Sequence, residues 1–272
     1  TSTVWQFSRS LGSIAKRFPE RFAQLALSLS LNTHPYYVSA IFDAFAHKIF
    51  SADLPTEEKA TWRPATVNTV EKVFGRFKAG DDRDSAMSFC RLVHARSEEN
   101  WSDATIERLI HYAKSHHDLE PDKLNMHCDK TANEATVRIL YENTINCVRG
   151  VAAEAIGALL WDHIDWLDKL TPGIEALVRD IHPVVRMAAI DALLPVLNID
   201  KDIAVNWFCL ACRDDLRVAA SPRAVYFFNH VFSSNAEQLT PLIKAMVNSP
   251  LDEVSQEGAE EVTARWLFHD YF

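Results

Sequence analysis

The chain has 272 residues and a net charge of −9, with 48% hydrophobic and 24% charged residues. The negative balance argues against a dedicated nucleic-acid-binding protein, which needs clustered Lys and Arg to neutralise phosphates. Only seven glycines occur, and because hairpins and phosphate-binding loops depend on glycine, this scarcity favours an all-helical chain.

Helical patterns follow one another along the chain and are separated by short polar connections. Phe22, Leu25 and Leu29, for example, recur at the three- and four-residue steps of a buried helical stripe. Most prolines stand where a helix would begin, the position where a missing N–H costs least. Helices are expected over 3–17, 19–30, 35–50, 55–78, 82–97, 102–115, 144–161, 163–179, 183–197, 200–212, 215–232, 236–248 and 252–269.

The stretch 115–133 is the least patterned and is expected to be a long loop. It divides the chain into an anterior helical-repeat region, 1–130, and a region of more regular repeats, 131–272, unless the two form one continuous array. The chain begins with Thr1 rather than Met, so we expect a piece of a longer polypeptide, with any catalytic domain lying elsewhere.

One pattern in the second region recurs at a fixed spacing. A Val-Arg pair is followed at the same offsets by small and apolar residues, and a partial third and a fainter fourth copy come later. The copies are Val148-Arg149 with Ala152, Ala153, Ala155 and Ile156; Val185-Arg186 with Ala189, Ile190, Ala192 and Leu193; Leu216-Arg217 with Ala220 and Ala224; and Val254 with Gly258, Ala259 and Val262. A helical period of about 40 residues is typical of α-solenoids.

With Asp180 and Pro183-Val184 ahead of its second copy, this pattern resembles the second helix of HEAT repeats. The resemblance implies an all-α fold: a HEAT-like α-solenoid of antiparallel helix pairs without a sheet. It also implies a structural role for Arg149, Arg186 and Arg217, because in that family the arginine helps to hold neighbouring repeats together.

A second resemblance rests on short strings that are spread over the chain. They are Phe18-Pro-Glu-Arg-Phe-Ala-Gln-Leu-Ala-Leu27, His34-Pro35-Tyr36-Tyr37, Ile145-Asn-Cys-Val-Arg-Gly150 and Leu197-Asn-Ile-Asp200. Their combination resembles the C-terminal helical arms of bacterial STAND-type ATPases, the NLR-like antiviral proteins. This resemblance implies a sensor fragment that binds a phage protein and is attached to other domains of the same polypeptide, while not being an enzyme itself.

Candidate chemistry was sought in three places, and none is assigned. The spacing of Gly75 and Gly80 opens a P-loop, but Asp81-Asp82 stands where Lys-Ser/Thr is required, and carboxylates would repel a phosphate. Cys209 and Cys212 lie in an apparent helix, which favours buried thiols over a redox pair. The histidine-rich group has no standard zinc spacing: His111, His116, His117, His127 and Cys128. We therefore expect no catalytic residue, cofactor or metal.

The expected function is that of a non-enzymatic protein-recognition module. Exposed aromatic residues on the concave side would anchor the partner, and the candidates are Trp161, Trp166, Trp207, Tyr226, Phe227 and Phe228. Two alternatives remain open: an architectural or self-associating helical scaffold, and a HEAT-like DNA-binding or glycosylase module, which the acidic charge disfavours. No apolar run approaches about 18 residues and no signal peptide is visible. The five cysteines are odd in number and suit reduced thiols, so we expect a cytoplasmic protein with no membrane contact.

Overall fold

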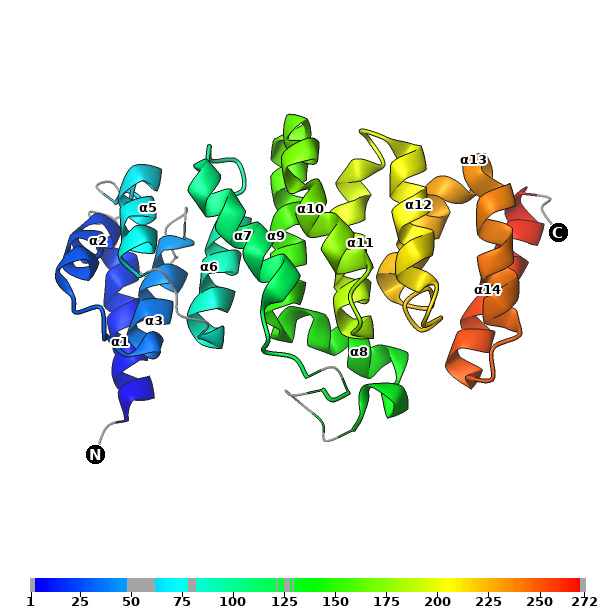
Figure 1. Cartoon of the computed structure of the whole chain (residues 1–272), viewed down its shortest axis with the longest axis horizontal. Helices are drawn as coiled ribbons and strands as arrows, with labels where there is room; N and C mark the ends of the chain where they lie inside the picture. Colours follow the sequence, from blue (N-terminus) through cyan, green and yellow to red (C-terminus); the bar gives the residue numbers. More distant parts are fainter. Residues whose placement is uncertain are drawn as a thin grey trace. The chain divides into compact units, whose positions relative to one another are not determined.

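The computed structural model describes residues 3–47, 62–77, 82–120, 122–124, 128 and 130–269. Within these residues the chain forms 13 α-helices, three short 3₁₀ helices and no strand (Figure 1). An isolated bridge between Lys123 and Thr131 is the one β-type pairing among them. The prediction of an all-α chain is therefore confirmed. None of the described helices is both long enough and apolar enough to cross a membrane.

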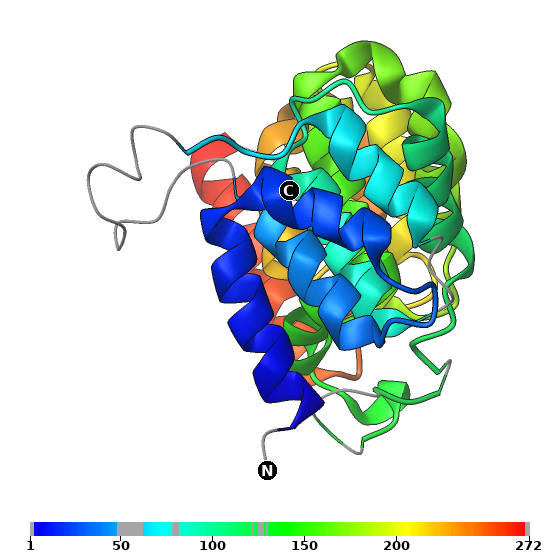
Figure 2. The ribbon, with the colours of Figure 1, turned by 90° about the vertical axis from the view of Figure 1, so that its left-hand side faces the viewer.

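The chain divides into two compact units, Thr1–Tyr112 and Ala113–Phe272. The division falls near the end of α7, whereas the sequence suggested one after residue 130. Unit 1 contains α1 (Val4–Arg17), α2 (Pro19–Ser28), α3 (Pro35–Phe45), α5 (Val67–Arg76), α6 (Arg83–Ala95) and most of α7 (Asp103–Ser115). Figure 2 faces this unit and shows α1, in dark blue, beside α3.

Among the described helices of unit 1, helices that do not follow one another directly lie side by side. Helix α1 packs on α3 and α3 packs on α6, while α2 packs on α5. The close approach of α1 and α3 depends on Gly12, where an added Cβ would lie 3.3 Å from the carbonyl oxygen of Ala40. Polar side chains begin several of these helices, because each accepts a hydrogen bond from an otherwise unpaired backbone N–H; they are Thr3, His34, Thr66 and Asp82.

Unit 2 repeats this arrangement with longer helices. It comprises α8 (Val137–Asn143), α9 (Val148–Asp162), α10 (Leu167–Val178), α11 (Pro183–Val196), α12 (Lys201–Cys212), α13 (Pro222–Val247) and α14 (Asp252–His269), with 3₁₀ turns at Ala132–Glu134, Thr144–Asn146 and Ile164–Trp166. Helix α11 packs against α9 and also against α10 and α12, and α13 packs against α14. Helix α13 is kinked at Asn235, whose φ and ψ of −129° and 30° are not helical.

The small residues of the recurring pattern account for the close packing of α9 and α11. All its alanines in these two helices are buried, as are Ile156 and Leu193. Gly157 continues the contact, because a Cβ at this position would lie 2.8 Å from the carbonyl oxygen of Asp191. The pattern therefore marks the helix–helix interface of unit 2, as small side chains let two backbones approach.

The structure corrects two of the expected helix bounds. The helix expected over 215–232 begins at Pro222, because the Ser221 side chain accepts a hydrogen bond from the Ala224 N–H and Pro222 occupies the first helical turn. Leu216 and Arg217 therefore lie in turns before the helix. Helix α8 occupies 137–143, where no helix was expected. Of the helix expected over 55–78, the described part is α5, and residues 48–61 and 78–81 lie outside the described residues.

Candidate functional site

Two arginines of the recurring pattern join successive helices of unit 2. The Arg149 guanidinium on α9 donates to the Asp180 carboxylate at 2.8 Å and to the Leu119 carbonyl at 3.3 Å. Arg186 on α11 pairs with Asp214 at 3.3 Å. Asp180 precedes α11 and Asp214 precedes α13, so each arginine links its helix to the turn before the next helix of the same layer. The HEAT resemblance implied that these arginines hold neighbouring repeats together, and that these helices are such repeats remains a prediction.

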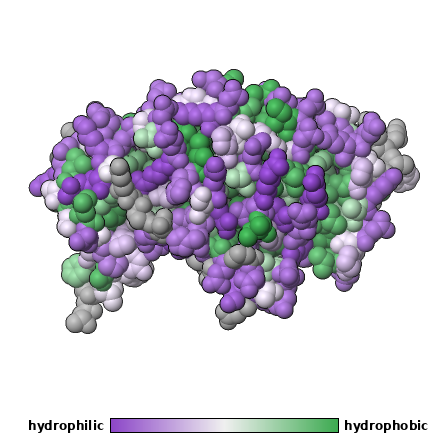
Figure 3. All heavy atoms as spheres, in the orientation of Figure 1, coloured by the Kyte–Doolittle hydropathy of each residue, from purple (hydrophilic) through white to green (hydrophobic). Residues whose placement is uncertain are grey.

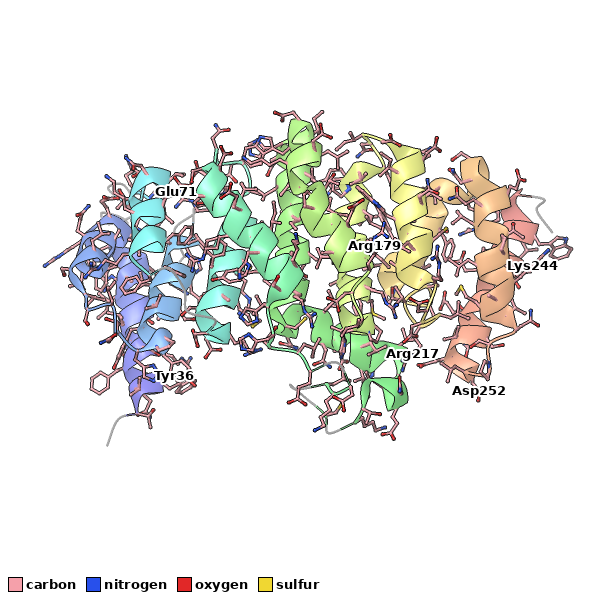
Figure 4. The ribbon with its side chains drawn as sticks, viewed as in Figure 1. Tyr36, Glu71, Arg179, Arg217, Lys244 and Asp252 are labelled. Carbon is pink, nitrogen blue, oxygen red and sulfur yellow. The ribbon has the colours of Figure 1, made fainter. Side chains whose placement is uncertain are left out.

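Arg217, the third arginine, has a different geometry. It lies in the turns before α13 and is almost fully buried. Its guanidinium pairs with Asp215 at 2.6 Å and donates to the carbonyl oxygens of Ala132 and Ala135 at 2.9 and 2.5 Å. Figure 4 shows Arg217 close to α8. Arg217 therefore fixes the segment that leads into α8, whereas Arg149 and Arg186 each bind the turn before a following helix.

The described part of the connection between α7 and α8 contacts the starts of α9 and α11, and the first residue of α8 contacts α14. The Asp118 carboxylate accepts a hydrogen bond from the Val148 N–H at the start of α9. The Lys123 carbonyl lies 3.3 Å from Nε2 of His182, which precedes α11, and the Val137 N–H donates to Glu253 of α14 at 3.0 Å. Together with the Arg149 and Arg217 bonds, these contacts anchor the described part of the connection.

His182 acts in this network as a neutral side chain. Burial, together with the positive charges of Arg149, Arg186 and Arg217, lowers the pKa of His182 to about 4, although the hydrogen bond to the Lys123 carbonyl opposes this shift. Its Nδ1 accepts a hydrogen bond from the Val184 N–H, which leaves the proton on Nε2 to be donated to the Lys123 carbonyl. His182 is therefore neutral near neutral pH, with both ring nitrogens bonded within the network.

The outer surface of α9, α11 and α13 carries a charged row. Asp191 of α11 pairs with Arg223 of α13 at 2.9 Å, and Glu154 of α9 is close enough to act on Asp191 electrostatically. Burial raises the pKa of Asp191 to about 6, with Arg223 lowering it and Glu154 raising it. A carboxylate held in this way is a candidate functional group, since perturbed pKa values concentrate at functional sites.

Exposed aromatic side chains lie on the same helices as this row. Trp161, two helical turns after Glu154, is 57% exposed, and Tyr226, one turn after Arg223, is 53% exposed. The Tyr226 ring packs on His230 with ring centroids 4.2 Å apart. We refer to Glu154, Trp161, Asp191, Arg223 and Tyr226 as the α9–α13 surface.

The other aromatic candidates have different positions. Phe227 and Phe228 are fully buried and pack on Phe208, with ring centroids 4.3 and 5.1 Å apart. Trp166 and Trp207 are partly buried. Of these six residues, Trp161 and Tyr226 are exposed; that exposed aromatics lie on a concave side and anchor a partner remains a prediction.

Two grooves lie between described helices of unit 1. One, of about 500 Å³, lies between α1 and α3 and is lined by Trp5, Arg9, Lys16, Tyr36 and Asp43, among others. Burial raises the pKa of Asp43, although a Ser88 hydrogen bond and nearby cations oppose this effect.

The second groove, of about 450 Å³, lies between α5 and α7 and has a floor of Phe74, Phe89 and Tyr112. The Glu71 side chain at its edge accepts hydrogen bonds from Ser102 and Thr105 and so caps α7 (Figure 4). Arg108 lies over the Phe89 ring at 4.5 Å and donates to the carbonyl oxygens of Phe74 and Phe77. These polar groups have structural partners, so the groove has no evident catalytic group.

The metal and thiol candidates from the sequence do not form a site in the described residues. No group of three or more His, Cys, Asp or Glu side chains is placed there to hold a metal ion; His127 lies outside that part of the chain. His116 bonds to Asp118 at 3.0 Å and stacks on His117. Cys212 is buried in α12, and burial raises the pKa values of both Cys209 and Cys212. Gly75 lies within α5, and the rest of the P-loop-like string is not described.

Comparisons with known proteins do not identify the chain. No family model, curated protein or solved structure matches it. The function must therefore be argued from the residues alone.

The sequence analysis missed Asp191 and Arg223. Asp191 is the one acid within an otherwise apolar stretch, Met187–Leu194, and this signal could have singled it out. Its partner Arg223 comes from another helix and has no signal in the sequence.

Proposed function

We propose that this chain is a non-enzymatic protein-recognition module built as a HEAT-like α-solenoid, and that the α9–α13 surface contacts its partner. The solenoid is supported within each unit by the order of packing. Among the described helices, α1–α3–α6 lie side by side in unit 1 and α9–α11–α13 in unit 2, while α2 packs on α5 and α10 on α12 in a second layer. Stacked helix pairs pack in this way.

The observation that carries the proposal is that exposed Trp161 and Tyr226 lie on α9 and α13, the two helices that pack on either side of α11, whose Asp191 pairs with Arg223. Trp, Tyr and Arg are the residue types most often found at binding hot spots. In the space-filling view, hydrophilic residues cover most of the visible face, with apolar patches between them (Figure 3).

We further propose that the partner is a phage protein and that the chain is a sensor fragment of a bacterial antiviral STAND ATPase. This step is supported by the short strings that resemble the helical arms of that family, including Ile145–Gly150 at the start of α9. In this proposal, the sensor itself performs no chemistry, and the ATPase belongs to another part of the polypeptide.

The test is affinity selection with the intact chain as bait and a panel of individually expressed phage proteins as prey. We expect at least one phage protein to be retained by the wild-type chain and lost by the Trp161→Ala/Tyr226→Ala variant. The control is Ile181→Ser, which removes an exposed apolar side chain from the turn before α11 and should retain the same protein. Retention that is equal in all three chains would refute the assignment of this surface.

A further inference from the structure

The second groove of unit 1, between α5 and α7, is open at a position where the fold does not require it. Gly75, in the last turn of α5, lines this α5–α7 groove, and a Cβ at this position would meet nothing within 4 Å. Its φ is not positive, so neither the backbone nor a neighbouring group demands glycine. Glycine lowers helix stability relative to alanine, and what Gly75 provides in the structure is an open groove wall.

Arg108 of α7 lies at the same groove and is held in a fixed orientation. Its three guanidinium nitrogens donate to the Tyr112 hydroxyl and to the carbonyl oxygens of Phe74 and Phe77. One face of the guanidinium lies over the Phe89 ring, 4.5 Å from its centroid. Because this face and each nitrogen are engaged, the half-buried Arg108 has its second flat face left for the groove.

A flat aromatic ring is the group that this face binds best. Guanidinium groups stack on aromatic rings, and a guanidinium that is already fixed loses little freedom when it does so. Phe74 and Phe77, whose carbonyls hold Arg108, flank Gly75 in the sequence, so the open wall adjoins the guanidinium. The groove volume of about 450 Å³ lies within the range of small-molecule sites, about 300–1,000 Å³.

The charged groups of the groove favour a positive ligand. Glu71 and Glu107 line it together with Arg108, so the carboxylates outnumber the guanidinium. Both hydrogen bonds to Glu71 use Oε1, which leaves Oε2 as an acceptor, and Glu107 is exposed. An anion would lie beside these carboxylates and find each nitrogen of Arg108 already bonded, whereas an ammonium group gains from both carboxylates.

We propose that the α5–α7 groove binds a small aromatic amine, with its ring stacked on Arg108 beside Gly75 and its ammonium group at Glu107 and Glu71. A neutral ring would make no use of the two carboxylates, and a cation without a ring would leave the open wall unfilled. The groove belongs to unit 1 and shares no residue with the α9–α13 surface, so the inference does not depend on the proposed function.

The test measures the binding of tryptamine by equilibrium dialysis. Indole-3-propionate has the same ring with a carboxylate, and n-butylamine has the ammonium group without a ring. The pH is 8, above the usual titration range of histidine, because His111 also lines the groove. We expect tryptamine to bind with a dissociation constant of about 1 mM or lower, and both comparison compounds to bind at least about tenfold more weakly.

Two substitutions assign the binding to the groove. Gly75→Leu fills the open wall and should weaken tryptamine binding at least about tenfold. Glu107→Gln removes one carboxylate and should weaken it about twofold to fivefold. The matched control is Glu237→Gln, which removes an exposed acid from α13 and should have no effect. Since the net charge of −9 attracts any cation, this control separates the groove from the charge of the whole chain.

Thermal unfolding shows whether each variant is folded like wild type; if Gly75→Leu is not, Glu107→Gln alone decides. The proposal is overturned if tryptamine does not bind or if either comparison compound binds equally. It is also overturned if a folded Gly75→Leu binds like wild type, or if Glu107→Gln and Glu237→Gln have equal effects. The Trp161→Ala/Tyr226→Ala variant should bind tryptamine like wild type, which separates this test from that of the proposed function. Loss of binding in that variant would place the ligand on the α9–α13 surface and overturn the assignment to the groove.

Discussion

Replacing Arg217 tests whether the connection before α8 is fixed by this side chain. The Arg217→Met substitution keeps the length of the side chain but removes the guanidinium. The carbonyl oxygens of Ala132 and Ala135 then lose the guanidinium as a donor, and the Asp215 carboxylate keeps the hydrogen bond from the backbone N–H of residue 217 but loses its ion pair. Leaving a buried polar group unpaired costs about 1–3 kcal/mol, and breaking a buried ion pair about 3–5 kcal/mol. We expect the free energy of unfolding to fall by about 3–5 kcal/mol, since these estimates overlap and do not add.

Urea unfolding followed by circular dichroism measures this loss. The control is Arg138→Met on α8, whose side chain is 82% exposed and lies 3.8 Å from Glu142; its loss should stay below about 0.5 kcal/mol. Equal losses for the two variants would refute the reasoning, because they would show that the buried contacts of Arg217 stabilise no more than a surface ion pair.

Three further predictions concern the helices of both units. The pKa of Asp191 is raised from 3.8 to about 6, so between these pH values the folded chain holds a proton that the unfolded chain releases. The contribution of this proton to the free energy of unfolding is lost as the pH rises from about 4 through 6. Asp191→Asn should therefore raise the free energy of unfolding at pH 8 by up to about 3 kcal/mol and have less effect at pH 4. Urea denaturation at both pH values measures this change, and equal effects at the two pH values would contradict the prediction. Gly157→Ala should cost about 1–3 kcal/mol, because its Cβ would meet the backbone of Asp191, whereas Gly75→Ala, with open space around it, should gain up to about 1 kcal/mol; thermal unfolding of the pair checks the opposite signs. Cys212, buried and with its pKa raised well above the usual 9, should react with iodoacetamide only after unfolding, and rapid labelling of the native chain would show that α12 opens.

The helices of unit 2 were predictable because their sequence and their packing agree. In α9 and α11 every residue of the recurring pattern from the Val-Arg pair onward is buried, so the pattern reports the interface directly. The predicted start of α13 was wrong, although the sequence contains the signal for the correct one. Ser221-Pro222 is a strong helix-start signal, but similarity to the earlier copies of the pattern favoured a start at residue 215.

The contacts of the α7–α8 connection could not be predicted. The side chains of Arg149, His182 and Arg217 bind main-chain carbonyls of this connection. Every residue has such a carbonyl, so the residue types of the connection do not indicate which ones are bound. The orientation of α1 could not be predicted for a different reason. Its large apolar residues recur at helical spacing, which ordinarily marks a buried stripe. In the structure the large residues are exposed and the small residues of α1 face α3.

The radius of gyration of the intact chain in solution tests most directly whether the helices form an open solenoid. A compact domain of this length has a radius of gyration of about 18–19 Å, whereas six helix pairs stacked about 10 Å apart form a longer particle. Small-angle X-ray scattering of the monomer should give a value clearly above the compact one. A value at or below about 19 Å would contradict the solenoid and, with it, the layered surface on which the proposed recognition depends.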